Sequence, residues 1–510
     1  MKLGKPHISI QDQCSVFPGA EFAHKDLKRR TIRGGLITVF ANFMIFILRL
    51  GSTAILARLL VPKDFGLIAM VLVFIGFANL LKDAGFSTAT IQRDVITHDQ
   101  VSTLFWLNVG LSIICMSIII ASSPIIAWLY QEPQLTWISV AISGSFILSG
   151  LTIQHQAILR RQMRFGTLAL INIASIFFST LVAIFLALQG FAFWSLVGMH
   201  ISQAAVNAAL VWFICRWRPN YPKRGVKIRA MVVFGGNLTV SNFLIYCIRN
   251  LDNLLIGSLF GATALGLYSK AYQLLMMPIT QINGPISVAV LPALSRLQND
   301  PERFRRFYLK GISYLSFVGM PVVVFSFIAA DQIIGILLGS GWDDAVILYR
   351  VLAPAALIGT LNVVTGWIFI PLGQGKKQLK AASFGSFITM VALLVGIRWG
   401  TIGVAVAFSC SEMIKRLPQI MYACAGSPIT VNSIWMAIYQ PMISSLAGGT
   451  FCLFTMNYFK NNTNLIALFY LWIVFIIIYV SVFFLFPSSK HFLKNFLYDI
   501  KLSIKKKRMV

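Results

Sequence analysis

Long apolar runs recur along the whole chain, and they leave no room for a large soluble domain. The sequence is 57% hydrophobic and 12% charged, with a mean hydropathy of +0.78. A soluble domain averages about 25% charged residues, whereas a bilayer-spanning helix needs about 20 mostly apolar ones. We therefore predict an all-α integral membrane protein of about 14 transmembrane helices. The predicted spans include 135–158, 231–257, 345–372, 379–398 and 400–424, and short amphipathic pieces are expected at Pro124–Tyr130 and Asp331–Leu338.

The distribution of positive charge predicts the orientation of the chain. The net charge is +27, from 43 Lys and Arg against 16 Asp and Glu. If the N-terminus is cytoplasmic, 35 of the 43 Lys and Arg fall on the cytoplasmic side of the predicted helices, as the positive-inside rule requires. Both termini are then cytoplasmic, and no nucleic-acid partner is needed to explain the charge. The exceptions are Arg49, Arg58, Lys63, Arg249, Lys270, Arg350, Arg398 and Lys460.

An internal repeat appears when the sequence is shifted by 200 residues. The matches between the first and seventh predicted helices include Gly35/Gly235, Asn42/Asn242, Arg49/Arg249 and Gly66/Gly266. Both helices enter the membrane from the same side, so the repeats are parallel, and transporters built this way bind substrate between their lobes. The expected organisation is a cytoplasmic tail (1–33), an N-lobe of six helices (34–214), a basic cytoplasmic linker (215–230), a C-lobe of six helices (231–424), two further helices (432–487) and a basic cytoplasmic tail (488–510).

Two arginines lie inside apolar helices, where a charge is costly unless it faces a polar cavity. Arg49 and Arg249 occupy equivalent positions of the repeat, and each belongs to a polar stripe at helical spacing. Arginine binds oxyanions in bidentate fashion and keeps its charge, so the pair predicts an anionic substrate headgroup such as a pyrophosphate. The stripes consist of Thr38, Asn42, Arg49 and Ser52 on the first helix, and of Thr239, Asn242, Tyr246, Arg249 and Asn253 on the seventh.

Three other charged positions leave alternatives open. Asp252 follows Arg249 by three residues and could neutralise it on the same helix face. Lys270 lies one turn into its helix, where it either contacts substrate or extends to the membrane interface. Glu412 is either a proton or cation coupling site or the ion-pair partner of Arg416.

Motifs for catalysis and for cofactors are lacking in the sequence. No phosphate-binding G-x-x-x-x-G-K-[ST] occurs, the six histidines show no ligand spacing, and the seven cysteines are scattered singly. We therefore expect a transporter and not an enzyme, without a bound cofactor or metal. A proton or cation gradient would supply its energy.

Three stretches of the sequence resemble the polysaccharide transporter family. They are AILARLLVPKDFGLIAMVLVFIGFANLLKDAGFSTATIQ (54–92), RNLDNLLIGSLFGATALGLYSKAYQLL (249–275) and AILRRQMRF (157–165). The similarity is to Wzx-type lipid-linked oligosaccharide flippases, colanic-acid-exporter-like members of the multidrug/oligosaccharidyl-lipid/polysaccharide (MOP) exporter superfamily.

The resemblance implies a substrate and a place of action. An undecaprenyl-pyrophosphate-linked oligosaccharide repeat unit would be moved from the cytoplasmic to the periplasmic leaflet of a bacterial inner membrane by alternating access. This step would serve capsule, exopolysaccharide or O-antigen (lipopolysaccharide) assembly, with membrane lipids and other export components as further partners. Cationic cavity residues are thought to bind the pyrophosphate in the family, a role that would fall to Arg49, Arg249 and Lys270, with Asn42, Asn242 and Asp252 as polar or charged neighbours.

Two other functions compete with the flippase. A drug/cation antiporter of the same superfamily should have an acidic site, whereas the intramembrane charges here are mostly basic. A membrane glycan polymerase or ligase usually needs a large outer loop, and none is predicted.

Overall fold

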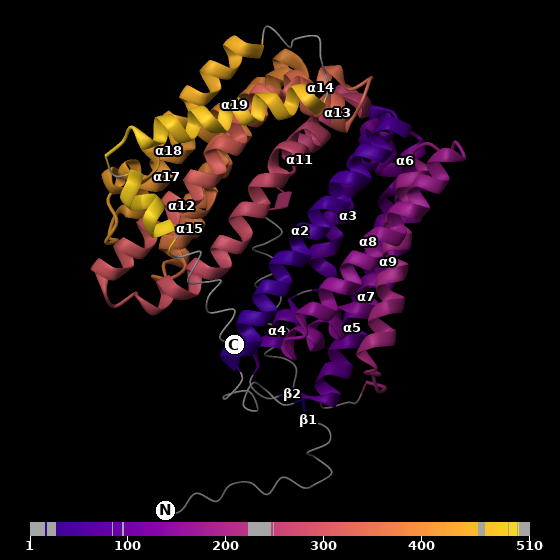
Figure 1. Ribbon diagram of the computed structural model, residues 1–510. Coiled ribbons are helices and arrows are strands. Elements are labelled where there is room, and N and C mark those ends of the chain that lie inside the picture. The colour runs from indigo at the N-terminus through magenta and orange to yellow at the C-terminus, as the bar shows by residue number, and fades with distance from the viewer. Residues whose placement is uncertain are drawn as a thin grey trace, which may run out of the picture. The chain divides into compact units, whose positions relative to one another are not determined.

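The computed structural model describes residues 16–17, 27–83, 85–93, 96–222, 246–247, 249–456, 465–487, 489–496 and 498. These residues are almost entirely helical, and the chain divides by its packing into two compact units (Figure 1). Unit 1 comprises Met1–Ser52 and Leu67–Asn250, and unit 2 comprises Thr53–Gly66 and Leu251–Val510. The hairpin between the first two long helices therefore belongs to both units, because its outermost part packs within unit 2.

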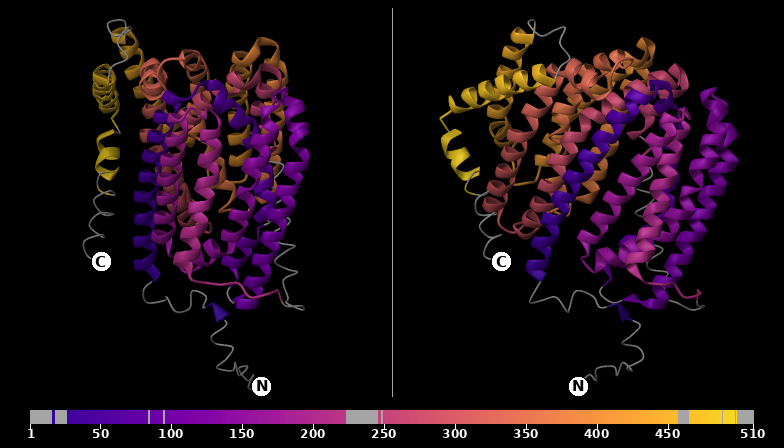
Figure 2. Two further views of the ribbon diagram at one scale, coloured as in Figure 1. Left: turned by 90° about the vertical axis from the view of Figure 1, so that its right-hand side faces the viewer. Right: turned by 45° about the vertical axis from the view of Figure 1, so that its right-hand side comes forward.

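Unit 1 is built from long helices that pack side by side, above all α5 on α7 and α8 on α9 (Figures 1 and 2). A capping box starts α5, in which Gln100 N donates to Thr97 Oγ1 and Thr97 N donates to Gln100 Oε1. The elements are β1 (Val16–Phe17), α2 (Leu27–Leu59), α3 (Pro62–Asp83), α4 (Phe86–Gln92), β2 (Ile96–Thr97), α5 (His98–Tyr130), α6 (Gln134–Ser143), α7 (Ser145–Arg161), α8 (Phe165–Leu188) and α9 (Trp194–Cys215). The strands β1 and β2 pair antiparallel over two residues each.

Unit 2 has a core of buried aromatic and aliphatic side chains around Phe304, Tyr308 and Trp367. The side chain of Asp300 caps the start of α12 by accepting from Arg303 N at 3.0 Å. The elements are α11 (Leu251–Arg296), α12 (Pro301–Ile328), α13 (Ala330–Leu337), α14 (Asp343–Gly359), α15 (Asn362–Phe369), α16 (Gly375–Gly396), η2 (Ile397–Trp399), α17 (Gly400–Cys424), α18 (Val431–Met456), α19 (Leu465–Phe484) and a short helix over 489–496.

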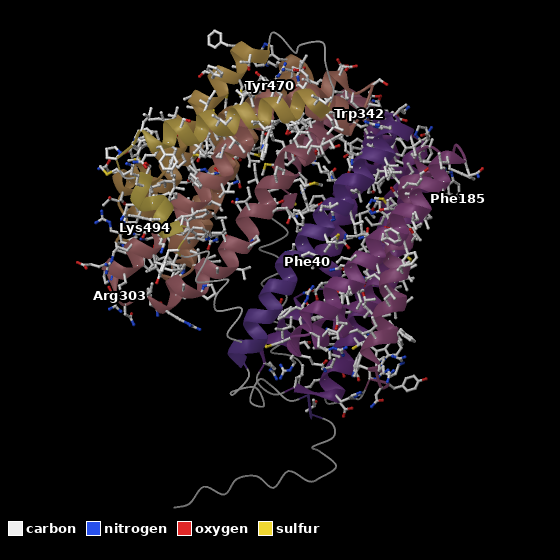
Figure 3. The ribbon with its side chains drawn as sticks, in the orientation of Figure 1. Phe40, Phe185, Arg303, Trp342, Tyr470 and Lys494 are labelled. Carbon is white, nitrogen blue, oxygen red and sulfur yellow. The ribbon has the colours of Figure 1, made fainter. Side chains whose placement is uncertain are left out.

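The outer surfaces of these helices carry large apolar side chains. Phe185 on α8 and Ile466 on α19 are 61% and 81% exposed, and the side chain of Phe185 is marked in Figure 3. Such a surface requires a lipid environment, since water-soluble proteins rarely expose large contiguous apolar patches. The all-α membrane architecture predicted from the sequence is confirmed.

The number of spanning helices is not confirmed. Among the described residues, 11 helical stretches are long and apolar enough to cross a membrane. One of them, Gly375–Cys424, contains two predicted spans, 379–398 and 400–424. Most of the predicted span 231–257 lies outside the described residues, so the count of about 14 stays a prediction.

One of the two predicted amphipathic pieces is confirmed. Asp331–Leu338 matches α13 almost residue for residue. Pro124–Tyr130 is not a separate piece, because α5 continues through Pro124 to Tyr130. The loss of one backbone donor at this proline does not end the helix, since the residues on either side keep their helical hydrogen bonds.

Candidate substrate-binding site

Helix α2 has two exposed faces, one apolar and one polar. Phe40 and Ile47 are 65% and 44% exposed. Asn42 and Arg49 are also exposed, and because they are seven residues apart they lie within about 20° of each other on the helix. Phe40, marked in Figure 3, and Ile47 lie about 160° or more from Arg49. If the apolar face meets lipid, the face with Arg49 must meet a polar environment, since an arginine facing hydrocarbon costs several kcal/mol.

The second predicted arginine, Arg249, is exposed in the same unit as Arg49. Its predicted neighbour Asn242 lies outside the described residues. Within the part of the chain that the structure describes, Arg249 has no ion-pair partner.

Asp252, the alternative partner for Arg249, is engaged elsewhere. Its carboxylate is buried in unit 2, where Tyr268 Oη donates to Oδ2 at 2.8 Å and Asn253 N donates to Oδ1 at 2.8 Å. These two hydrogen bonds satisfy the buried carboxylate without a cation. Asp252 is therefore held by hydrogen bonds within unit 2 and forms no ion pair with Arg249 in this structure.

Lys270 is half-buried on α11 and belongs to unit 2, whereas Arg49 and Arg249 belong to unit 1. Its Nζ donates to Gln273 Oε1 at 2.9 Å and lies 4.4 Å from the centre of the Phe65 ring. A cation over an aromatic face is attracted by the ring quadrupole. The ammonium thus has partners within the protein, which makes it a weaker candidate for substrate contact than Arg49.

Glu412 on α17 forms ion pairs with two cations of its own helix. Its carboxylate lies 2.5 Å from Lys415 Nζ and 3.1 Å from Arg416 Nη2, and all three side chains are largely buried. Arg416 also donates to Asn362 Oδ1, and Lys415 Nζ donates to Thr389 Oγ1 at 2.8 Å. The sequence left Glu412 either as a proton or cation coupling site or as the ion-pair partner of Arg416, and the structure shows the ion pair.

A buried polar network in unit 1 is absent from the sequence predictions. Thr90 Oγ1 donates to Gln154 Oε1 at 2.9 Å, and Gln154 Nε2 donates to Asn108 Oδ1 at 2.8 Å. Asn108 Nδ2 then donates to the carbonyl of Lys82 at 3.0 Å, near the end of α3. The helix breaks directly afterwards at Gly85, whose φ is 68°. The sequence signal for this network was the polar Gln154 within an apolar span.

The fold of the chain is that of multi-pass membrane transporters. The lipid II flippase MurJ in an inward closed conformation aligns with a TM-score of 0.70 at 15% identity, covering 91% of this chain and all of that one. An inward-facing multidrug resistance MATE family transporter of the MOP superfamily aligns with a TM-score of 0.60 at 14% identity, covering 77% of this chain and 98% of that one. These likenesses confirm the expected fold.

The sequence itself identifies the family. The profile of the family described as "Polysaccharide biosynthesis protein" matches residues 55–347, more than half of the chain, so the chain belongs to that family. The lipopolysaccharide biosynthesis protein WzxC of Escherichia coli (strain K12) is 24% identical over 81% of this chain and 86% of its own length. The teichuronic acid biosynthesis protein TuaB of Bacillus subtilis (strain 168) is 26% identical over 83% of this chain and 88% of its own length.

A third relative is named for transport. The succinoglycan biosynthesis transport protein ExoT of Rhizobium meliloti (strain 1021) is 23% identical over 70% of this chain and 72% of its own length. The resemblance to polysaccharide transporters drawn from the sequence is confirmed, and the chain groups with transporters and not with enzymes.

Proposed function

We propose that this protein is a flippase that moves an undecaprenyl-pyrophosphate-linked oligosaccharide from the cytoplasmic to the periplasmic leaflet of a bacterial inner membrane. The family and the names of the relatives supply the sugar and the pathway class, because they belong to lipopolysaccharide, teichuronic acid and succinoglycan biosynthesis. The observation that carries the proposal on this chain is the exposed arginine of α2 on the face opposite to its apolar side.

The two arginines suit a pyrophosphate headgroup. The planar guanidinium forks of Arg49 and Arg249 match phosphate oxygens in bidentate geometry and keep their charge at any physiological pH. Asn42, on the same face of α2 as Arg49, would add a neutral donor for the same oxygens or for a sugar hydroxyl. A cation-binding drug antiporter would need the opposite charge at this place.

The transport cycle would be alternating access, in which the site opens to one leaflet at a time. A proton or cation gradient would supply the energy. Both termini would lie in the cytoplasm, as the charge distribution indicates.

The test is deletion of the gene in its own host, followed by complementation. The deletion strain should lose its surface polysaccharide and accumulate lipid-linked repeat units that an impermeant glycosidase cannot reach in intact cells. Re-expression should reverse both effects. Unchanged surface polysaccharide with no accumulated lipid-linked units would refute the proposal.

A further inference from the structure

The loop between α2 and α3 makes a reciprocal contact with the part of α11 that follows its break. We call the segment Thr53–Gly66 the hairpin tip; it packs within unit 2. A Cβ added to Gly66 would lie 1.7 Å from the carbonyl oxygen of Ala262, and one added to Gly266 would lie 1.9 Å from that of Pro62. Pro62 and Ala262 are counterparts in the 200-residue repeat, as are Gly66 and Gly266. Gly66 contacts Ala262 and Gly266 contacts Pro62, so each segment makes the same contact with the other, as in a two-fold symmetric interface.

The backbone bends at the same place in both copies of the repeat. Helix α2 ends at Leu59 and α3 begins at Pro62. In α11 the matching break falls at Gly261, where φ is 81° and ψ is −179°. The two segments that follow these breaks approach until their backbones touch, which only residues without side chains allow. Any substitution of Gly66 or Gly266 must therefore push the segments apart.

The hairpin tip makes further contacts within unit 2 through a backbone carbonyl, through the buried ring of Phe65 and through the exposed side chain of Arg58. Trp342 Nε1 donates to the carbonyl of Ala57 at 3.0 Å, and its ring packs edge-on against Phe65 at 5.4 Å between centroids. Figure 3 shows Trp342 at the start of α14. Arg58 Nη2 donates to the carbonyl of Ile336 at 2.7 Å from an exposed position, so water can replace this acceptor when the two separate.

The hairpin tip is also tied to unit 1 through the chain. Helix α2 before Thr53 and helix α3 after Gly66 belong to unit 1, although the tip between them packs in unit 2. Any movement of the tip out of its position in unit 2 would therefore be transmitted along two helices, one of which carries Arg49 about one turn before the tip begins. The tip lies at the end of α2 remote from the cytoplasmic tail, hence on the outer side in the predicted orientation.

We propose that this reciprocal glycine contact is a releasable seal, formed while the outer side is closed and separated when the substrate site opens outward. The proposal rests on the proposed transport function for its purpose. Its elements are Gly66 against Ala262, Gly266 against Pro62, and the hydrogen bonds of Arg58 and Trp342.

Accessibility of a buried probe at the seal gives the first test. Ala57→Cys, at a position only 2% exposed, is introduced into a protein whose natural cysteines have been replaced. Labelling by a membrane-impermeant maleimide is then measured in intact cells. Adding Gly66→Ala or Gly266→Ala should raise labelling at least several-fold because the seal cannot close. Gly51→Ala on α2 should leave labelling unchanged, since nothing lies within 4 Å of a Cβ there.

Linking the seal shut gives the second test. Arg58→Cys with Ile336→Cys is joined by a short thiol-reactive linker that a reductant removes. Export of lipid-linked sugar should stop in the linked protein and return on reduction. The matched control joins Lys377→Cys to Ala425→Cys, where Lys377 Nζ now donates to the Ala425 carbonyl at 3.1 Å, and should export normally.

Two results would overturn the seal: glycine variants that label no more than Gly51→Ala, or a linked protein that exports at the unlinked rate. Labelling needs no substrate. If the unlinked protein does not move lipid-linked sugars at all, the proposed function is refuted. The labelling experiment still shows, independently of transport, whether the seal opens.

Discussion

At the level of single residues, Arg49 is notable as an exposed charge on a candidate membrane-spanning helix. The helix exposes apolar side chains such as Phe40 on one face and Arg49 on the other. An exposed face that is not apolar has to meet water or a polar ligand. Asp252, the residue that could have neutralised the equivalent Arg249, is bonded to Tyr268 instead.

We predict that Arg49→Ala and Arg249→Ala each reduce export about 10- to 100-fold, since a hydrogen bond to a charged group contributes about 1.5–3 kcal/mol. Arg49→Lys should restore part of the activity, because lysine keeps the charge but not the bidentate fork. Surface polysaccharide in the complemented deletion strain is the measurement, with membrane levels of the protein checked by blot. Arg303→Ala, which breaks an exposed pair with Asp300, is the control and should export normally. Wild-type export from both alanine variants would remove these residues from the site.

Substitutions of Glu412 can distinguish a structural role of this residue from a role in coupling transport to a proton or cation gradient. Removing its carboxylate by Glu412→Ala leaves Lys415 and Arg416 without this counter-charge in a largely buried place. Breaking a buried pair in this way destabilises by about 3–5 kcal/mol. We expect a clear fall in the thermal unfolding temperature of the detergent-purified protein, whereas exposed Glu302→Ala should change little. A Glu412→Gln variant with normal unfolding and no export would instead support the coupling role.

At the level of elements, the break between α3 and α4 is held by a side-chain network. The chain turns at Gly85, and Asn108 Nδ2 donates to the carbonyl of Lys82 just before the turn. Asn108 is oriented by Gln154, which is fully buried. The network thus supplies a donor for carbonyls at the end of α3, where the helix itself offers none.

We predict that Gln154→Leu destabilises unit 1 by about 1–3 kcal/mol, because it leaves the buried groups of Thr90 and Asn108 unpaired. A lower unfolding temperature of the purified protein is the expected reading. Ser149→Ala on the same helix removes only a bond to the Ser145 carbonyl within the helix and serves as control. Equal stability of the two variants would contradict a structural role for the network.

The sequence predicts where apolar helices lie better than where they break. The predicted spans 135–158 and 345–372 each match one candidate span, Gln134–Arg161 and Asp343–Phe369, but the sequence did not predict the short irregularities at Gly144 and near Thr360 that divide them into α6 and α7 and into α14 and α15. Hydropathy measures how apolar a segment is, and both halves of a broken span are equally apolar. The breaks depend on tertiary contacts that one-dimensional patterns do not contain.

At the level of the whole molecule, the sequence predicts the fold class and the candidate site residues, but not the contacts that those residues make. Arg49 and Arg249 could be found because charges are rare in apolar helices and because the repeat aligns them. That Asp252 pairs with Tyr268, 16 residues away, could not be found from spacing on one helix face. In the sequence, Gly66 and Gly266 appear only as a matched pair of the repeat. Their close contacts with the backbones of Ala262 and Pro62 could not be predicted, because a glycine in a sequence pattern does not indicate which segment packs against it.

The orientation of the chain follows from where its basic loops fall, and each unit offers a matched pair of positions to test it. The last turn of α7 and the loop after it carry Arg160, Arg161 and Arg164, and Arg303, Arg305 and Arg306 lie in the first turns of α12. Because the positive-inside rule places such segments in the cytoplasm, the loops at the opposite helix ends should face the periplasm.

Single cysteines in a cysteine-free background can therefore report the side of each loop. We expect a membrane-impermeant maleimide to label Gln189→Cys in unit 1 and Asp343→Cys in unit 2 in intact cells, since both positions are exposed at loop ends away from the basic segments. Gln162→Cys and Asn299→Cys, which are equally exposed beside the basic segments, should react only after the membrane is permeabilised. Labelling of one unit in the expected sense and of the other in the reverse sense would mean that the two units are inverted, which would exclude the parallel repeat.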